Sequence, residues 1–386
     1  MNNREEVYLE DKEVYKLAME TLIKELGLDL SGKDYSEEEI LEVVLQAAAK
    51  QTSIEQVCKN SEVGPSGNTV RGIIHEQLDL HQVETRANAM LQQRLPCRMW
   101  KKARRGAIDL VLVPYHGEAQ KEETEIVRSQ PKSGTTHFHA YATAFVVEKG
   151  RRFTLAITFV RSTDELTEIL QRLQTRVAEL KIRIKCWLLD KEFYTVEVIR
   201  FMKQGKKSFI IPVVIRGKKN PPGGTRALVA GKRSYWTTYT MRSQKSGEIS
   251  FRVAVVAKNW AGRMQRKGRR MLAFAVFGIK AQLKDIAEIY RRRFGIETSY
   301  RQMNQARGRT TSRSPVLRML FVAIAFMLRN LWAWLHWAVV AQPCQGNRQL
   351  RTTVFSLEQM LDWISNICKA HLIPSNKLIV GFPLVI

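Results

Sequence analysis

The chain has 386 residues, enough for two or three domains, and its 45% hydrophobic content allows a full buried core. Its 62 Lys and Arg residues exceed its 37 Asp and Glu residues, which gives a formal charge of +25 and indicates a polyanionic partner. Five cysteines without a CxxC pair exclude a disulfide-rich secreted scaffold. Because the N-terminus is acidic and lacks a signal peptide's apolar stretch, we expect a cytoplasmic, nucleoid-associated protein.

The positive charge is unevenly distributed along the chain. Residues 1–50 hold 13 acids and 6 bases, a net of −7, so the remaining residues carry +32. An acidic leader does not attract a polyanion by bulk charge. The basic body after it is therefore the expected contact with nucleic acid or with an anionic membrane surface.

Residues 1–95 are predicted to be helical and to bind DNA. Two short helices, at 53–60 and 68–78, flank a Gly/Pro turn, which is the outline of a helix-turn-helix. Asn68 is the expected N-cap of the second helix, and Arg71 on that helix is a candidate DNA contact. An ordinary helical hairpin explains the pattern equally well.

Residues 96–215 change to a strand-rich pattern with helices between the later strands. A turn at 148–151 separates two of the strands. The order β-β-β-α-β-α-β is typical of the first part of an RNase H-like α/β core with a mixed five-stranded sheet. The predicted strands are 107–115, 138–147, 153–160, 184–190 and 208–215, and the predicted helices are 163–180 and 194–203.

Residues 216–280 interrupt this order with a Lys/Pro/Gly-rich loop and three short β-like stretches, which predict an inserted β-rich subdomain. Helical periodicity resumes over 283–306, and residues 281–344 are assigned to the last part of the core. Residues 345–386 form a C-terminal tail to which no structure is assigned. The three stretches are 234–241, 249–257 and 271–277.

The apolar segment 315–341 is long enough to span a bilayer. Arg318, Arg329 and His336 interrupt it, and a central arginine is costly in lipid. A buried helix of a protein core explains the segment better, so no membrane partner is expected.

Three acids lie where two-metal chemistry would need them. Asp109 is in the middle of the first strand, Asp190 ends the fourth strand, and Glu297 lies on the late helix. The first and fourth strands of an RNase H-like sheet are neighbours, so the two aspartates would meet, and a helix packed across the sheet would add the third carboxylate. Two Mg²⁺ ions about 3.5–4 Å apart can activate an oxygen nucleophile and stabilise a leaving oxygen.

Each acid alone has an ordinary structural explanation. An Asp at a strand end is usually a cap or turn residue, and a Glu on a basic helix is usually an ion-pair partner. Asp109 is harder to explain in this way, because Ile108 and Leu110 flank it within an apolar strand. The set of three is a stronger indication than any one member.

The late helix carries Tyr290-x-x-Arg293-x-x-x-Glu297, which resembles the Tyr-Arg-Glu-Lys signature of the insertion-sequence-four group of DDE transposases. At 100° per residue, these three side chains share one helix face. The resemblance covers roughly residues 105–340. Two further motifs are similar to the same group, namely Pro114-Tyr115-His116-Gly117 and Asp190-Lys191-x-Phe193-Tyr194.

The resemblance implies an enzyme that cuts DNA at the ends of a mobile element and transfers the freed 3′ ends to target DNA. It implies that Asp109, Asp190 and Glu297 bind two Mg²⁺ ions, with Mn²⁺ as a substitute. Tyr290 and Arg293 would contact DNA near the cut, and the protein would act as a homodimer on paired DNA ends.

The sequence departs from the signature at its last position. Asn304 stands where the group has a Lys that is associated with holding the DNA backbone at the cut end. Asn can donate a hydrogen bond to a phosphate but cannot neutralise it. We expect Asn304 and Arg301 to contact DNA, with Arg307 or Arg309 as further replacements for the missing charge.

Trp236 lies in the β-rich segment between the second and third acids. Related transposases with a β insertion at this place close the element end as a hairpin, and an aromatic ring can hold a base that leaves the stack. Packing inside the β-rich segment is the alternative, and it is favoured. His137 and His139 form an HxH pair, but the sequence offers no further metal ligands at useful spacing.

Three other functions remain open. A structure-selective nuclease or resolvase would use the same metal chemistry without strand transfer. A catalytically inactive DNA-binding regulator would have kept the fold, although the retained acids argue against it. A membrane-associated basic protein would use the apolar segment and the charge.

Overall fold

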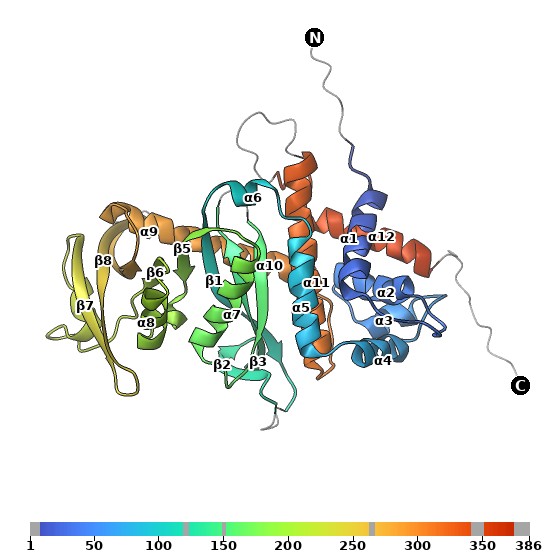
Figure 1. Cartoon of the computed structure of the whole chain (residues 1–386), viewed down its shortest axis with the longest axis horizontal. Helices are drawn as coiled ribbons and strands as arrows, with labels where there is room; N and C mark the ends of the chain where they lie inside the picture. The colour runs from blue at the N-terminus through green and yellow to red at the C-terminus, as the bar shows by residue number, and fades with distance from the viewer. Residues whose placement is uncertain (1–7, 119–122, 149–151, 262–266, 341–350, 374–386) are drawn as a thin grey trace, which may run out of the picture. The chain divides into compact units, whose positions relative to one another are not determined.

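The computed structural model describes residues 8–118, 123–148, 152–261, 267–340 and 351–373, which fall into two compact units (Figure 1). The sheet unit comprises residues 95–300. The helical unit combines the chain up to residue 94 with the chain from residue 301 onward. Most of the turn expected at 148–151 lies outside the described residues, as do parts of the C-terminal tail.

The sheet unit is built around one mixed sheet of nine described strands, in the order β2-β3-β1-β5-β6-β9-β8-β7 with β4 paired to β3. β1, β5 and β6 are parallel, and the other pairs are antiparallel. This confirms the predicted α/β class, whereas the RNase H-like assignment stays a prediction. The strands are β1 (Arg104–Tyr115), β2 (Ile126–Lys132), β3 (Thr135–Val146), β4 (Thr154–Val160), β5 (Ile184–Leu189), β6 (Phe209–Pro212), β7 (Tyr235–Ser243), β8 (Gly247–Ala261) and β9 (Lys267–Phe277).

Helices pack against this sheet because their apolar faces need a partner. α7 contacts β3 and β4, α8 contacts β7 and β8, and α9 contacts β8 and β9. α7 and α8 also supply the connections into β5 and β6, since parallel strands require crossover segments. The helices of this unit are α6 (Arg98–Lys101), α7 (Leu166–Glu179), α8 (Val196–Gln204) and α9 (Leu283–Arg291), together with the first part of α10 (Gly295–Gln305).

The segment 216–280, expected to be an inserted subdomain, supplies β7, β8 and β9, which continue the central sheet. β9 pairs with β6, and Phe209 lies opposite Phe277 in this register. The apolar pattern shows that a segment favours strands, but it does not show which edge the strands pair with. Here the fully buried Ile210 and Ile211 of β6 place an apolar edge next to β9.

The strand β2 was missed in the sequence analysis. It pairs with β3, and after the buried Ile126 most of its side chains are half-buried or exposed. Because β2 is an edge strand, it lacks the continuous apolar run that identified the central strands.

The helical unit contains the predicted helical N-terminal region, with one correction at a helix start. α4 begins at Gly67, and the Ser66 hydroxyl caps it by accepting a hydrogen bond from the Thr69 N–H at 3.1 Å. Asn68, the expected N-cap, already lies inside the helix. The helices are α1 (Asp11–Leu26), α2 (Glu37–Ala49), α3 (Ile54–Lys59), α4 (Gly67–Gln77), α5 (Leu80–Gln92), α11 (Pro315–Leu335) and α12 (Leu357–Leu372).

The apolar segment from Pro315 to Val340 is the single described helix long and apolar enough to cross a membrane, with a mean hydropathy of 1.6 in its most apolar window. That window is 89% buried inside the protein, where α11 packs against α2, α4, α5 and α12. Its buried polar groups have partners: Arg318 Nε donates to the Ser312 carbonyl at 2.8 Å. The segment is therefore a core helix of the helical unit, although the sequence analysis assigned it to the catalytic core.

The close approach of β1 and β5 depends on Gly106, which lies opposite Trp187. A Cβ atom at Gly106 would stand 2.5 Å from the Trp187 ring. We expect Gly106→Ala to lower the free energy of unfolding by about 1–3 kcal/mol in urea denaturation. Gly72→Ala is the matched control, because nothing lies within 4 Å of its added Cβ. Equal stability of the two variants would show that the sheet tolerates the added side chain.

Candidate active site

Asp109 is a carboxylate held inside the sheet unit. It lies in the middle of β1, opposite Thr143 of β3, and its side chain is 15% exposed. Its Oδ1 accepts a hydrogen bond from the Leu110 N–H at 2.9 Å. Burial raises the pKa of Asp109 to about 7; Arg293 opposes the shift and the Asp190 carboxylate adds to it. A carboxyl group in this position needs a cation nearby to stay ionised at neutral pH.

Asp190 is brought beside Asp109 by the parallel pairing of β1 and β5. Ile108 pairs with Leu189, and each aspartate directly follows its member of that pair. Asp190 directly follows β5 and is the N-cap residue of a short 3-10 helix, Lys191–Phe193. The sheet therefore presents both carboxylates at the same point along two neighbouring strands.

Arg293 joins these two acids to the third. Its Nη1 lies 2.8 Å from Asp109 Oδ2, and its Nη2 lies 3.3 Å from Asp190 Oδ1 and 3.1 Å from Glu297 Oε1. Arg293 lies in a 3-10 turn, Arg292–Phe294, between α9 and α10, whereas the sequence predicted one continuous helix over 283–306. All three acids singled out from the sequence thus contact one guanidinium.

The charge balance of this cluster is unusual for a protein interior. The Arg293 side chain is 7% exposed and faces three carboxylates, of which Glu297 is the most exposed at 44%. Burial alone would lower the pKa of Arg293, but Tyr290 and the carboxylates outweigh this effect and raise it. Carboxylate oxygens converging on one cation are also the hard donor set that divalent ions prefer. Among the described residues, no three His, Cys, Asp or Glu side chains are arranged in this structure to hold a metal ion.

Tyr290 is buried and packs inside the sheet unit. It is 7% exposed, its ring lies 5.2 Å from that of Phe274, and its hydroxyl donates to the Leu189 carbonyl at 3.2 Å. The sequence analysis expected Tyr290 and Arg293 to contact DNA. In this structure both side chains are buried, and Tyr290 anchors α9 beside Asp190; their contact with DNA stays a prediction.

Tyr300 was missed in the sequence analysis, although its spacing offers a signal. It lies seven residues after Arg293 and three after Glu297 on the same helical segment. Its hydroxyl donates to the Asp109 carbonyl at 3.1 Å and lies 2.8 Å from the Thr143 hydroxyl. Since its single proton is used on the carbonyl, the Thr143 hydroxyl donates in that second bond. Burial raises the pKa of Tyr300 well above its usual range, so the hydroxyl stays protonated.

Glu192 is a fourth carboxylate near the cluster that sequence reasoning also missed. It lies two residues after Asp190, in the 3-10 helix. Burial and the Asp190 carboxylate raise its pKa. It forms no ion pair with Arg293 in the described structure, so it contributes to the negative field rather than to the shared contact.

Trp236 lies in β7 and packs partly buried against the apolar core of the sheet unit. The Arg252 guanidinium lies over its ring at 3.8 Å from the centroid, which is a cation–π arrangement. These contacts support the packing interpretation of Trp236 over base capture.

The remaining sequence candidates lie in the helical unit or on β3. Arg301 and Asn304 are exposed on the last turns of α10, and Arg71 on α4 is paired with Glu55 at 3.1 Å. His139 is 3% exposed and its ring packs edge-on against Tyr115. Within the described residues, no metal-binding group of three forms around the HxH pair.

The Tyr300 hydroxyl provides a direct test of how the cluster is held. Tyr300→Phe would leave the Asp109 carbonyl and the Thr143 hydroxyl without this partner, so we expect the free energy of unfolding to fall by about 1–3 kcal/mol. The control is Tyr35→Phe, because the Tyr35 hydroxyl has no hydrogen-bond partner in the described part of the chain. Chemical denaturation measures the free energy of unfolding of both variants. If the two variants lose equal stability, Tyr300 does not tie α10 to β1.

Comparison with known proteins agrees with this geometry. A family model described as "Transposase DDE domain" matches residues 100–331, more than half of the chain and a range that contains all three clustered acids. No curated protein matches the chain. The insertion-sequence-four grouping stays a prediction. On the strength of the family match, the chain belongs to the DDE transposase family.

Proposed function

We propose that this protein is a metal-dependent transposase that cuts DNA at the ends of a mobile element and joins those ends to target DNA. The observation that carries the proposal is the convergence of Asp109, Asp190 and Glu297 on one guanidinium. The three acids come from a strand, the end of the neighbouring strand and a helix, and they are 81 and 107 residues apart in sequence. An ordinary surface ion pair does not need such an assembly.

We assign the metal ions to the same three carboxylates. Domains of this family generally use divalent ions, and the hard oxygen donors here suit Mg²⁺, with Mn²⁺ as a substitute. When bound, a pair of such ions supplies an activated water or 3′-hydroxyl and stabilises the leaving oxygen of the phosphodiester. The chain contributes the fixed placement of the acids on β1 and β5.

Arg293 acts as the internal counter-ion of the metal-free site. It contacts one oxygen of each acid, and it would withdraw from them when a metal ion takes over their charge. A withdrawn guanidinium is well suited to pair with a DNA phosphate, because its fork geometry matches two phosphate oxygens. The DNA contact expected of Arg293 therefore belongs to the loaded site. The DNA contact expected of Tyr290 stays a prediction.

The DNA partner follows from the family and agrees with the net charge of +32 after residue 50. We further propose a homodimer on paired DNA ends, acting in the cytoplasm at the nucleoid. A nuclease without strand transfer would share the whole site. An assay that follows joining of a labelled 3′ end to a second duplex separates the two functions.

Neutralising one ligand tests the metal assignment. We expect Asp109→Asn, Asp190→Asn and Glu297→Gln each to abolish cleavage of the element's own flanking DNA with Mg²⁺, while DNA binding is retained. The loss of one anionic oxygen weakens metal placement without changing the basic surface. Glu288→Gln is the matched control, because Glu288 is exposed and paired with Arg291 on α9. Any one of the three variants that cuts at the wild-type rate would remove its residue from the site.

Replacing the counter-ion tests the role of Arg293. In EDTA, Arg293→Gln leaves three clustered carboxylates without their cation, and we expect a loss of about 3–5 kcal/mol in the free energy of unfolding. We expect added Mg²⁺ or Mn²⁺ to raise the melting temperature more in this variant than in the wild type, because no guanidinium competes with the metal. Arg292→Gln, an exposed neighbour, is the control. Equal metal-induced shifts in wild type and Arg293→Gln would contradict competition at this place.

A further inference from the structure

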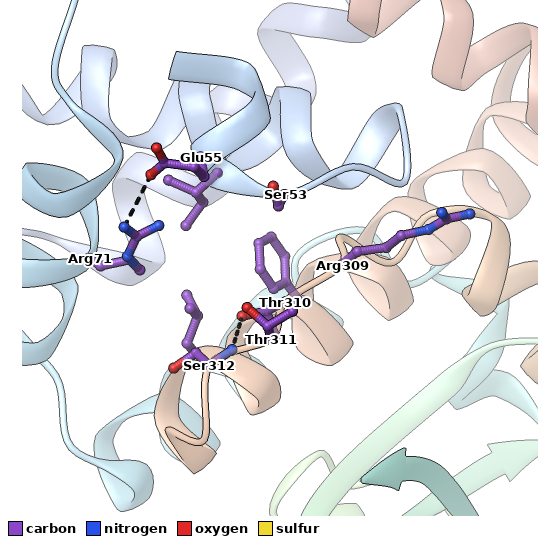
Figure 2. A pocket seen from close by; sticks show the side chains of 10 residues that line it. Ser53, Glu55, Arg71, Arg309, Thr310, Thr311 and Ser312 are labelled. Carbon is purple, nitrogen blue, oxygen red and sulfur yellow. Dashed lines mark hydrogen bonds and ion pairs between the residues drawn. The ribbon is translucent and has the colours of Figure 1, made fainter. Parts of the chain in front are cut away.

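A cavity lies in the helical unit, whereas the acids assigned to catalysis belong to the sheet unit. It has a volume of about 630 Å³, and α3, α4 and the segment before α11 surround it (Figure 2). Seven of its ten lining residues are polar. The polar wall includes Ser53, Glu55, Arg71, Arg309, Thr311 and Ser312.

The segment from Gly308 to Ser314 is held in a defined shape. The Arg309 N–H donates to the Thr52 carbonyl at 2.8 Å, and the Ser312 carbonyl accepts from Arg318 Nε at the same distance. Gly308 is required because a Cβ atom there would stand 2.3 Å from the Phe321 ring. Two hydrogen bonds therefore tie the backbone of this segment to its neighbours.

The sequence around this cavity segment is strongly basic. The sequence contains no Asp or Glu from residue 298 to residue 357. At the cavity, Glu55 is already paired with Arg71, and Figure 2 shows the Arg309 side chain extending away from that pair. Arg309 and Arg313 are exposed, and neither guanidinium has a partner within the described residues. Two cations on an ordered segment are thus available to an anion from outside.

We propose that the segment Gly308–Ser314 is a DNA-backbone site, in which Arg309 and Arg313 each neutralise one phosphate. The hydroxyls of Thr311 and Ser312 beside them are neutral donors that suit phosphate oxygens. The inference rests on the proposed function, since it takes the anion to be DNA. It adds a contact from the helical unit that lies outside the Tyr-Arg-Glu pattern. Arg318, by contrast, is buried and holds the segment together.

The test is the salt dependence of binding to a labelled duplex of random sequence, with the full chain. Each neutralised phosphate contributes about 0.9 to the slope of log affinity against log salt. The double variant Arg309→Gln/Arg313→Gln should therefore have a slope shallower by about 1.8 than the wild type. Arg309→Lys/Arg313→Lys keeps both charges and should keep the slope. Thermal unfolding checks that each variant is folded.

A second double variant, Lys16→Gln/Lys33→Gln, removes the same charge from exposed side chains of the helical unit that already pair with acids. If Arg309→Gln/Arg313→Gln has the same salt-dependence slope as this control, the inference is overturned and the proposed function still stands. Binding of poly-glutamate, a model acidic protein, is measured with the same variants. If Arg309→Gln/Arg313→Gln keeps the wild-type slope for DNA but no longer binds poly-glutamate, the segment binds an acidic protein partner and the inference is overturned. A wild-type protein that binds no duplex would remove the proposed function and the inference together.

Discussion

The contact between one buried guanidinium and three carboxylates is the interaction on which the site depends. Within the described residues, Arg293 is the ion-pair partner of both Asp109 and Asp190. Like charges about 4 Å apart repel by ~4 kcal/mol at an effective dielectric constant of about 20. Such a repulsion is a large part of the stability of an ordinary domain. The acids can be held together only when a proton, the guanidinium or a metal ion offsets their charge.

Hydrogen bonds position this contact because they hold α9 against β5 and α10 against β1. The Tyr290 hydroxyl binds the carbonyl of Leu189, the residue before Asp190. The Tyr300 hydroxyl binds the carbonyl of Asp109 itself. The two tyrosines lie on either side of the 3-10 turn that carries Arg293, so the turn is fixed to both neighbouring strands. A site built in this way keeps its geometry through backbone contacts while its charges exchange partners.

The sequence was sufficient to predict the two strands beside which Asp109 and Asp190 meet, because β1 and β5 are central and therefore apolar. Asp109 stood out for this reason. The role of Arg293 could not be predicted in the same way, since helical periodicity shows a shared face but not what faces it. The edge strand β2 and the pairing of β9 with β6 depend on contacts between segments that are distant in sequence. Asn68 was chosen as a cap by residue type, whereas Ser66, two residues earlier, has the extended backbone that a cap needs.

The most direct test of the exchange between guanidinium and metal is a crystal structure with Mn²⁺ and cleaved DNA, using anomalous scattering to locate the ions. The account predicts ions at about 2 Å from oxygens of Asp109, Asp190 and Glu297, with the Arg293 guanidinium moved away from all three. Ions bound elsewhere, with Arg293 still in contact with the three carboxylates, would contradict it.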